Sequence, residues 1–334
     1  MVAGLVAGLL TTSVATTSAA ALTDDPFDRA RQAATQVSFT GTVEVRWLDG
    51  ATEHHEQLTV QSAEGSLLLK GLPKGSNQVM VSATSERLVQ HPDGGWNLLW
   101  PPVLDRVDGP DPGLKYQVTE HDGSPVAGRP TSVVDIRQGP LLREQVFLDR
   151  DTDLLLERRQ FDEHGSPTRA VGFTSLVIDE ATAAPPPPTG SADKAPEVLS
   201  PASLSSSAMA PGRLADGYTR VGVFRREGVV QVLYSDGIYE LSVFERRGEL
   251  DRHELGSTGG PVTVGKAAGW RYAWPGGQVV LWQAGPTVFT VVSDAPLDQV
   301  LTAARDLPVP AKRKPSAMER LRSVARTLIQ PLEG

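Results

Sequence analysis

Alternation of apolar and polar residues is the main pattern in this sequence. Every second position from residue 39 to residue 47 is apolar or glycine, and these positions are Phe39, Gly41, Val43, Val45 and Trp47. The residues between them are Thr or charged. A two-residue repeat of this kind is typical of a strand with one buried face. We therefore predict a strand at 39–47.

Segments of the same kind follow through most of the chain, separated by Asp-Gly, Gly-Gly and Pro-containing turns. In the first half they predict strands at 53–61, 66–71, 78–83, 87–90, 96–100, 116–121, 132–137, 142–149, 154–161 and 169–178. In the second half they predict strands at 219–225, 229–235, 239–246, 261–264, 269–274, 278–284 and 287–293. Many short strands at close spacing indicate large antiparallel sheets or barrels.

Two segments have a helical period instead. Residues 26–37 follow the capping pair Asp24-Asp25 and begin with Pro26, which suits a first helical turn. Residues 294–307 place Leu297, Val300 and Leu301 on one face. The expected fold class is therefore mainly β with covering helices, of the α+β type.

Composition divides the chain into parts. Residues 1–21 are apolar and then small, with small-x-small cleavage sites, and we interpret them as a secretory signal. The apolar core of this segment is shorter than the roughly 20 residues of a membrane span. Residues 181–211 are rich in Pro, Ser and Ala and are expected to link a first domain at 22–180 to a second domain at 212–308.

Residues 309–334 form a basic tail with an amphipathic pattern. Such a helix binds an anionic membrane surface peripherally, docks on a partner, or packs weakly on its own domain. The pattern leaves these alternatives open.

Charge and residue usage limit the function classes. The formal net charge is −8, which disfavours nucleic acid as a partner of the folded body. The chain has no Cys, which excludes thiol catalysis and thiolate metal ligands. His54 and His55 are adjacent, so on a strand they point to opposite faces and do not favour a metal site.

No catalytic motif is present in the sequence. Acidic residues gather at expected turns without a base or nucleophile beside them, and there is no GxSxG or phosphate-loop pattern. The sequence thus predicts a protein that is not an enzyme and uses no metal or cofactor.

Two groups of residues are candidates for binding. The first would line an apolar ligand cavity on one face of the first sheet, unless these side chains simply form its core; it comprises Phe39, Val43, Val45, Trp47, Leu69, Phe147 and Phe161. The second would contact a partner, since exposed aromatic rings are common at interfaces, or would pack internally; it comprises Trp96, Trp100, Tyr234, Tyr239 and Phe244.

The run at 126–167, with its GR, FLD and LLLER segments separated by acidic turns, resembles the MucB/RseB family. The opening SFTGTVEVRWLDG and the later LYSDGIYELSVF resemble the first strand and the second domain of that family. Asp153 stands where a glycine is common in the family, the linker is unusually long and proline-rich, and the basic tail has no matching counterpart.

The resemblance implies a LolA-like first domain, that is, a half-open antiparallel β-barrel with covering helices, followed by a smaller sheet domain with one helix. It also implies an exported regulator, periplasmic or otherwise extracytoplasmic, soluble or membrane-associated. Such a protein binds the extracytoplasmic segment of an anti-sigma factor and tunes sigma-factor release, with a lipid or other amphiphile as a candidate ligand. The alternative is a LolA-type lipid or lipoprotein carrier of the cell envelope.

Overall fold

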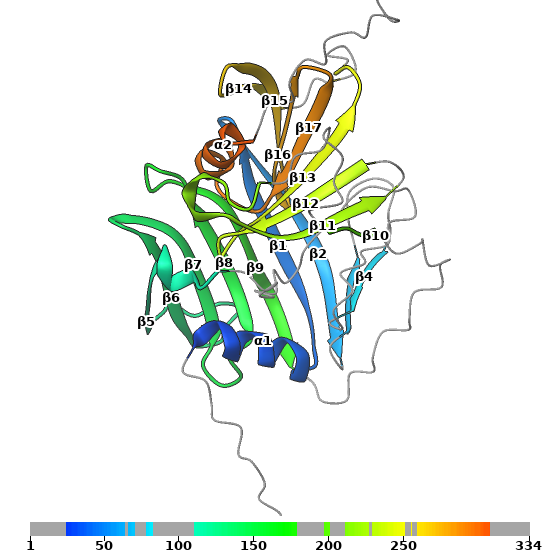
Figure 1. Cartoon of the computed structure of the whole chain (residues 1–334). Coiled ribbons are helices and arrows are strands. Elements are labelled where there is room, and N and C mark those ends of the chain that lie inside the picture. The colour runs from blue at the N-terminus through cyan, green and yellow to red at the C-terminus, as the bar shows by residue number, and fades with distance from the viewer. Residues whose placement is uncertain are drawn as a thin grey trace, which may run out of the picture.

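The chain folds into two antiparallel sheets, shown in Figure 1. The computed structural model describes residues 25–63, 66–70, 78–82, 110–178, 197–200, 211–226, 229–250, 255 and 259–307. Neither sheet closes into a barrel within these residues. The expected mainly β fold class is confirmed.

The first sheet has nine strands in the order β4-β3-β2-β1-β9-β8-β7-β6-β5. Their bounds are β1 (Phe39–Asp49), β2 (Thr52–Ala63), β3 (Ser66–Lys70), β4 (Gln78–Ser82), β5 (Gln117–Asp122), β6 (Thr131–Gln138), β7 (Leu141–Asp149), β8 (Leu155–Phe161) and β9 (Pro167–Ile178). Most strands pair with their sequence neighbours, and the exception is β1, which pairs with both β2 and β9.

The second sheet has eight strands in the order β10-β11-β12-β13-β17-β16-β15-β14. Their bounds are β10 (Glu197–Val198), β11 (Thr219–Arg226), β12 (Val229–Ser235), β13 (Glu240–Arg247), β14 (Gly260–Val264), β15 (Ala267–Trp274), β16 (Gly277–Ala284) and β17 (Thr287–Ser293). Nearly all of these strands coincide with the predicted ones within two residues, because tight turns at Gly237 and Gly285 end them sharply.

Helix α1 (Pro26–Gln36) begins at Asp25, whose carboxylate accepts a hydrogen bond from the Phe27 amide, as the sequence predicts. It crosses the end of the first sheet where β1 begins (Figure 1). The helix buries Phe27, Ala30 and Ala33, whereas the sequence pattern favoured Ala34 over Ala33. Buried positions three residues apart form a stripe that runs obliquely along the helix, which suits a short helix that crosses the strands at an angle.

Helix α2 (Leu297–Arg305) packs on the second sheet through Val300, Ala303 and Ala304. Two short 3-10 turns, η1 (Pro112–Leu114) and η3 (Ala215–Gly217), precede β5 and β11. None of the described helices is long and apolar enough to cross a membrane.

The end of the predicted linker is part of the fold. Glu197 and Val198 pair with Arg225 and Phe224 on β11, and the Leu199 amide donates to the Val223 carbonyl. Leu199 is buried in the main core. The Pro- and Ser-rich composition concealed this short strand, because two residues are too few to show an alternating pattern.

Several expectations fall outside the described residues. These are the signal segment, the strands at 87–90 and 96–100 with Trp96 and Trp100, and the basic tail.

Candidate functional site

The predicted apolar lining lies on one face of the first sheet and packs together. Val43 pairs with Leu58 and Phe173, and Val45 pairs with Val171 on β9. All of these side chains are buried in a single apolar cluster. The Phe39 and Phe173 rings meet edge to face, with centroids 5.5 Å apart.

The other candidates of this group are less uniform. Phe147 is buried in the same cluster, and Trp47 packs at its edge, where its ring stacks on His54 at 5.3 Å. Phe161 is half-buried, and the Leu69 side chain lies outside the described part of the chain. The structure thus brings Phe39, Val43, Val45, Trp47 and Phe147 together, and their side chains pack against one cluster on the inner face of the first sheet. A ligand cavity among them stays a prediction.

Gly41 explains how the Phe173 ring fits this interior. A Cβ atom at Gly41 would lie 2.5 Å from the Ser175 carbonyl oxygen and 2.9 Å from the Phe173 ring. Real Cβ atoms do not approach other atoms this closely. The glycine in the alternating pattern is therefore a packing requirement of β1 and not a weak point of the strand.

A polar row continues from this apolar cluster toward the second sheet. Directly paired residues share a face of a sheet, and the pairing places Glu144, Gln160, Arg169, Trp47 and His54 in one row across β7, β8, β9, β1 and β2. In the next row, Arg158 pairs with Val171. Charged side chains thus occupy inward positions where the sequence pattern would predict apolar residues.

The second sheet covers this row and supplies its partners. We call the polar residues between the two sheets the joint. It comprises Lys115, Tyr116, Gln138, Arg143, Glu144, Arg158, Asp216, Asp236, Tyr239, Asp294, Asp298 and Gln299.

At one end of the joint, Arg158 binds two carboxylates. Its guanidinium makes a bidentate pair with Glu144, with one bond of 2.8 Å, and its Nη1 lies 3.2 Å from Asp294 Oδ2 in the second sheet. Burial raises the pKa of Glu144 above its ordinary value, although Arg158 acts against this shift. Burial opposes the charge on Arg158, but Glu144 and Asp294 raise its pKa overall. A pair of this kind is stable only while both members are present.

Arg169 lies beside this group. Its Nε donates to the Pro275 carbonyl at 2.7 Å, which ties β9 to the turn between β15 and β16. Burial and the neighbouring Arg158 lower the pKa of Arg169 to about 10, so it remains charged at neutral pH. Arg271 of β15 contacts Asp49 at the tip of β1, at 3.3 Å.

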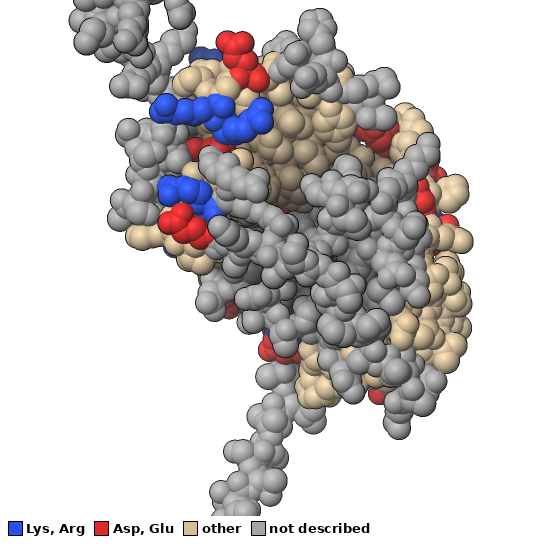
Figure 2. All heavy atoms as spheres, turned by 90° about the vertical axis from the view of Figure 1, so that its right-hand side faces the viewer, with Lys and Arg blue, Asp and Glu red and all other residues tan. Residues whose placement is uncertain are grey.

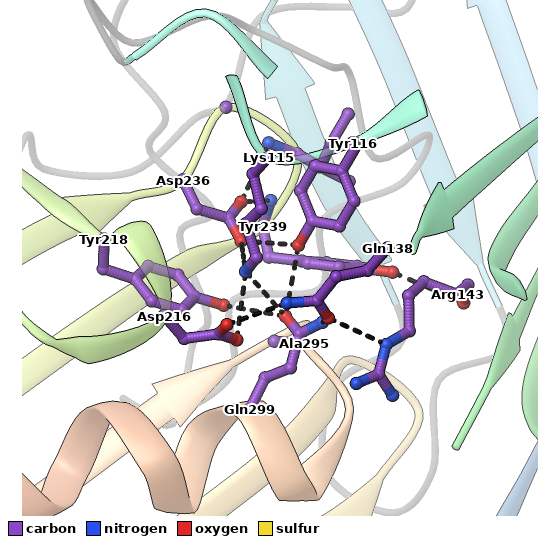
Figure 3. Close-up of polar contacts among 12 residues, drawn as sticks. Lys115, Tyr116, Gln138, Arg143, Asp216, Tyr218, Asp236, Tyr239, Ala295 and Gln299 are labelled. Carbon is purple, nitrogen blue, oxygen red and sulfur yellow. Dashed lines mark hydrogen bonds and ion pairs between the residues drawn. The ribbon is translucent and has the colours of Figure 1, made fainter. Parts of the chain in front are cut away.

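The centre of the joint is shown in Figure 3. Lys115 Nζ lies 2.5 Å from Asp236 Oδ2 and 3.1 Å from Asp216 Oδ2, and it sits over the Tyr116 and Tyr218 rings at 4.8 and 5.0 Å. The Tyr116 hydroxyl donates to Asp236 at 2.7 Å. Burial, together with the charge of Asp236, raises the pKa of Tyr116 well above its ordinary value. This tyrosine therefore acts as a neutral hydrogen-bond donor.

Amide side chains extend the network to α2. Gln138 donates to Asp216 at 2.9 Å, and Gln299 donates to Gln138 at 3.3 Å. Arg143 Nη2 binds Asp298 at the start of α2, at 2.9 Å. The network thus holds helix α2 and the β12–β13 turn against the first sheet.

Of the residues expected either to contact a partner or to pack internally, the structure describes Tyr234, Tyr239 and Phe244. Tyr234 and Tyr239 are fully buried, so neither ring is accessible to a partner in this structure, and Phe244 is half-buried. Tyr239 belongs to the joint, where its ring meets Tyr116 edge to face and its hydroxyl donates to the Arg143 carbonyl at 3.4 Å. The sequence pattern marked a real tyrosine hairpin, but that hairpin packs inside the molecule.

The described residues contain no group of three or more His, Asp or Glu side chains placed to hold a metal ion. The charged groups of the joint are paired with one another, and this arrangement positions two sheets. On the face shown in Figure 2, basic side chains of the described surface lie beside acidic ones.

The sequence reasoning missed the joint. The Asp236-Gly237 pair has the pattern of a turn, which does not distinguish a buried carboxylate from a solvated one. A usable signal was present on β7 and β8, where Glu144 and Arg158 interrupt apolar runs at inward positions. The signal is weak, because such charges also occur on strands with one solvated face.

No protein-family model matches this sequence, and the comparison with curated proteins also gives no match. Solved structures do match. One described as "Crystal structure of MucB in complex with MucA(peri)" is 21% identical, with a TM-score of 0.50, and the match covers 86% of this chain and 98% of that chain. Another, "Crystal structure of MucB", is 22% identical with a TM-score of 0.51 and covers 84% and 96%. The resemblance to the MucB/RseB family is thus confirmed at the level of the fold: this chain has the two-sheet fold of MucB.

Proposed function

We propose that this chain is a non-enzymatic extracytoplasmic regulator that binds the exported segment of a membrane-anchored anti-sigma factor. The observation that carries the proposal is the match to MucB over both sheets, at 86% of this chain and 98% of the MucB chain. One of the matching MucB structures contains MucA(peri) as its partner. The resemblance of the 126–167 run to the MucB/RseB family supplies the anti-sigma role of such a partner.

The arrangement of the charged side chains in the joint supports a binding function more than a catalytic one. Each of the five carboxylates in the joint contacts one of its three basic side chains, so among the described residues these charged groups hold the sheets together and are not arranged as an acid and a base facing a common space. A fixed arrangement of two sheets suits a protein that recognises an extended partner without transforming it. Export to the envelope is part of the proposal and is supported by the signal-like segment at 1–21.

An envelope pull-down tests this function. The purified chain is immobilised, incubated with a detergent-solubilised envelope fraction of its source, and the bound proteins are identified by mass spectrometry. We expect a single-pass membrane protein, and its extracytoplasmic segment alone should then bind the chain in isothermal titration calorimetry. The same chain immobilised after unfolding is the control.

Two outcomes would contradict the proposal. Recovery of no single-pass membrane protein counts against a regulator. Lipid extracted from the purified chain, together with no protein partner, would favour the LolA-type carrier. We expect neither outcome. The lipid extraction also tests whether the apolar side chains that pack together in the first sheet admit a ligand.

A further inference from the structure

The edge strands of the two sheets differ in how readily their outward backbone groups could pair with a further strand. In the second sheet, β14 carries Pro261, which lacks an amide hydrogen, and β10 is only two residues long. In the first sheet, β5 runs for six residues, Gln117–Asp122, without a proline. Figure 1 shows β5 at the left-hand margin of that sheet, beyond β6. Natural proteins usually block edges of this length.

The pairing with β6 shows which backbone groups of β5 point outward. Opposed residues in an antiparallel pair alternate between hydrogen-bonded and non-hydrogen-bonded pairs. The Gly123 amide donates to the Thr131 carbonyl at 3.0 Å, and these residues continue the pairing of Asp122 with Ser132. Counting back in steps of two, His121, Thr119 and Gln117 direct their backbone groups to β6. Val118, Glu120 and Asp122 therefore direct theirs to the outer edge.

The side chains along this edge change character from one end to the other. Leu114, just before the strand, is 82% exposed, and Val118 is partly buried. Glu120 and Asp122 follow on the same face, and both are exposed. Glu120 is paired with Arg29 and Asp122 with Arg150. The His121 Nδ1 atom lies 3.0 Å from the Asp122 carbonyl oxygen. Within the described part of the chain, the outward backbone groups of Val118 and Glu120 and the Asp122 amide have no contact of this kind.

We propose that the outer edge of β5 is a docking site at which an extended segment of a protein partner adds as a further strand, with apolar residues opposite Leu114 and Val118 and basic residues opposite Glu120 and Asp122. Main-chain hydrogen bonds give such a complex its affinity, and alternate side chains give it specificity. A second copy of this chain fits less well. In the twofold β5–β5 pair with the fullest overlap, Glu120 would lie opposite Glu120 of the second copy, and like charges directly opposite destabilise a sheet.

A designed peptide tests the edge directly. The probe is an acetylated and amidated nine-residue peptide with Thr at the odd positions and Val, Val, Lys and Lys, in this order, at the even positions. A second peptide has the reverse sequence, with the two Lys first. Amide hydrogen exchange is followed by NMR with and without each peptide. We expect slower exchange at Val118, Glu120 and Asp122 and no change at Gln117, Thr119 and His121, whose amides already face β6. Binding that protects neither set of amides overturns the proposal.

Two substitutions at one position separate the backbone from the side chain. Glu120→Pro and Glu120→Thr both remove the carboxylate that binds Arg29 and Ser132. Only Glu120→Pro removes the outward amide hydrogen, and proline is tolerated at such edge positions. We expect Glu120→Pro to bind the better peptide about tenfold more weakly than Glu120→Thr, which corresponds to one or two lost hydrogen bonds. Equal affinity of the two variants, with matching thermal melts, overturns the proposal.

This inference deepens the proposed function and rests on it for the natural source of the segment. The two fail separately. If the exported segment of the anti-sigma factor binds both variants equally, the proposed docking site on β5 is wrong and the proposed function still holds. If the peptide binds the edge but no anti-sigma segment binds the chain, the function is wrong. A dimer of the unsubstituted chain that is lost in Glu120→Pro would make a second copy the occupant and overturn the proposed partner.

Discussion

At the scale of single residues, the buried charges of the joint occur in groups that contain both signs. Glu144 is fully buried and Arg158 nearly so, and the pair reaches Asp294 of the other sheet. Taking both charges out of water costs several kcal/mol per ion, and their mutual attraction offsets this cost only while the pair is intact. Each member therefore depends on the other.

Removing one member should be more harmful than removing both. We expect Arg158→Met to lower the free energy of unfolding by about 3 kcal/mol, because Glu144 is left buried without a counter-ion. The double variant Arg158→Met with Glu144→Gln should recover most of this loss. Urea denaturation followed by circular dichroism measures both, and a double variant less stable than the single one would contradict the argument.

The same variant has a defined pH dependence. Burial already raises the pKa of Glu144, and Arg158 opposes the shift, so loss of Arg158 raises this pKa further. An acid with a raised folded-state pKa contributes most stability below its unfolded-state pKa, and that contribution is lost as pH rises through the folded-state value. The stability deficit of Arg158→Met should therefore be smaller at pH 5 than at pH 8. A deficit that grows on acidification would show that Glu144 is not the group responsible.

Gly41 gives a second test at this scale. We expect Gly41→Ala to destabilise the protein by about 2 kcal/mol, because the new methyl group meets the Ser175 carbonyl and the Phe173 ring. Gly212 is the matched control, since a Cβ atom there meets nothing within 4 Å. Thermal melts of Gly41→Ala and Gly212→Ala compare the two variants. Equal melting temperatures would mean that the residues around Gly41 move at little cost to accommodate the methyl group.

The sequence predicts the apolar interior better than it predicts the joint. Phe39, Val43 and Val45 follow from a local alternation, which is a property of neighbouring residues. The contacts of the joint that cross from one sheet to the other connect residues that are 78 to 184 positions apart, such as Gln138 with Asp216 and Lys115 with Gln299. No local pattern encodes such pairs, because a charged residue has the same sequence signature whether it is paired across domains or solvated.

At the scale of elements, strands and helices were predictable where turns and caps are sharp. Asp153 illustrates how local chemistry replaces a family preference: it has a φ of 58°, the left-handed conformation that favours glycine, and its carboxylate accepts a hydrogen bond from Arg29 at 3.1 Å. Aspartate tolerates this conformation better than most residues do. Strand β10 was not predictable, since its stability comes from β11 and from the buried Leu199 beside it.

The end of the linker should therefore contribute to stability. We expect Leu199→Ala to lower the free energy of unfolding by about 2 kcal/mol, as for other buried leucines. Val198→Ala is the control, because Val198 is 76% exposed and its loss should change stability by less than about 0.5 kcal/mol. Chemical denaturation of both variants tests this, and similar values would mean that β10 is not held in place.

At the scale of the whole molecule, the joint couples the two sheets. The Asp236 side chain is fully buried between Lys115 and Tyr116, both of which belong to the segment entering β5. A second apolar cluster, separate from the one around Phe39 and Phe173, also connects the sheets: it joins Ile136 of the first sheet to Leu241 of the second. We therefore expect the two sheets to unfold together.

Lys115→Met should uncouple them. It removes the cation between Asp216 and Asp236, and we expect a loss of about 3 kcal/mol and a single calorimetric transition that broadens or splits into two. Arg225→Met is the control, since it removes an exposed pair with Glu197, at 3.5 Å, that lies away from the joint. A sharp single transition with an unchanged midpoint in Lys115→Met would show that the apolar contacts alone couple the sheets.

The strand order of the first sheet has a consequence for biogenesis. Strand β1 pairs on one side with β2, its immediate successor, and on the other side with β9, where Phe39 lies opposite Ile178. A chain that is synthesised from its N-terminus must expose the second side of β1 until residue 178 has followed. Contacts between such distant residues form slowly and leave unpaired strands open to aggregation meanwhile. Folding of this protein should therefore depend on chaperones that shield nascent β1 during synthesis.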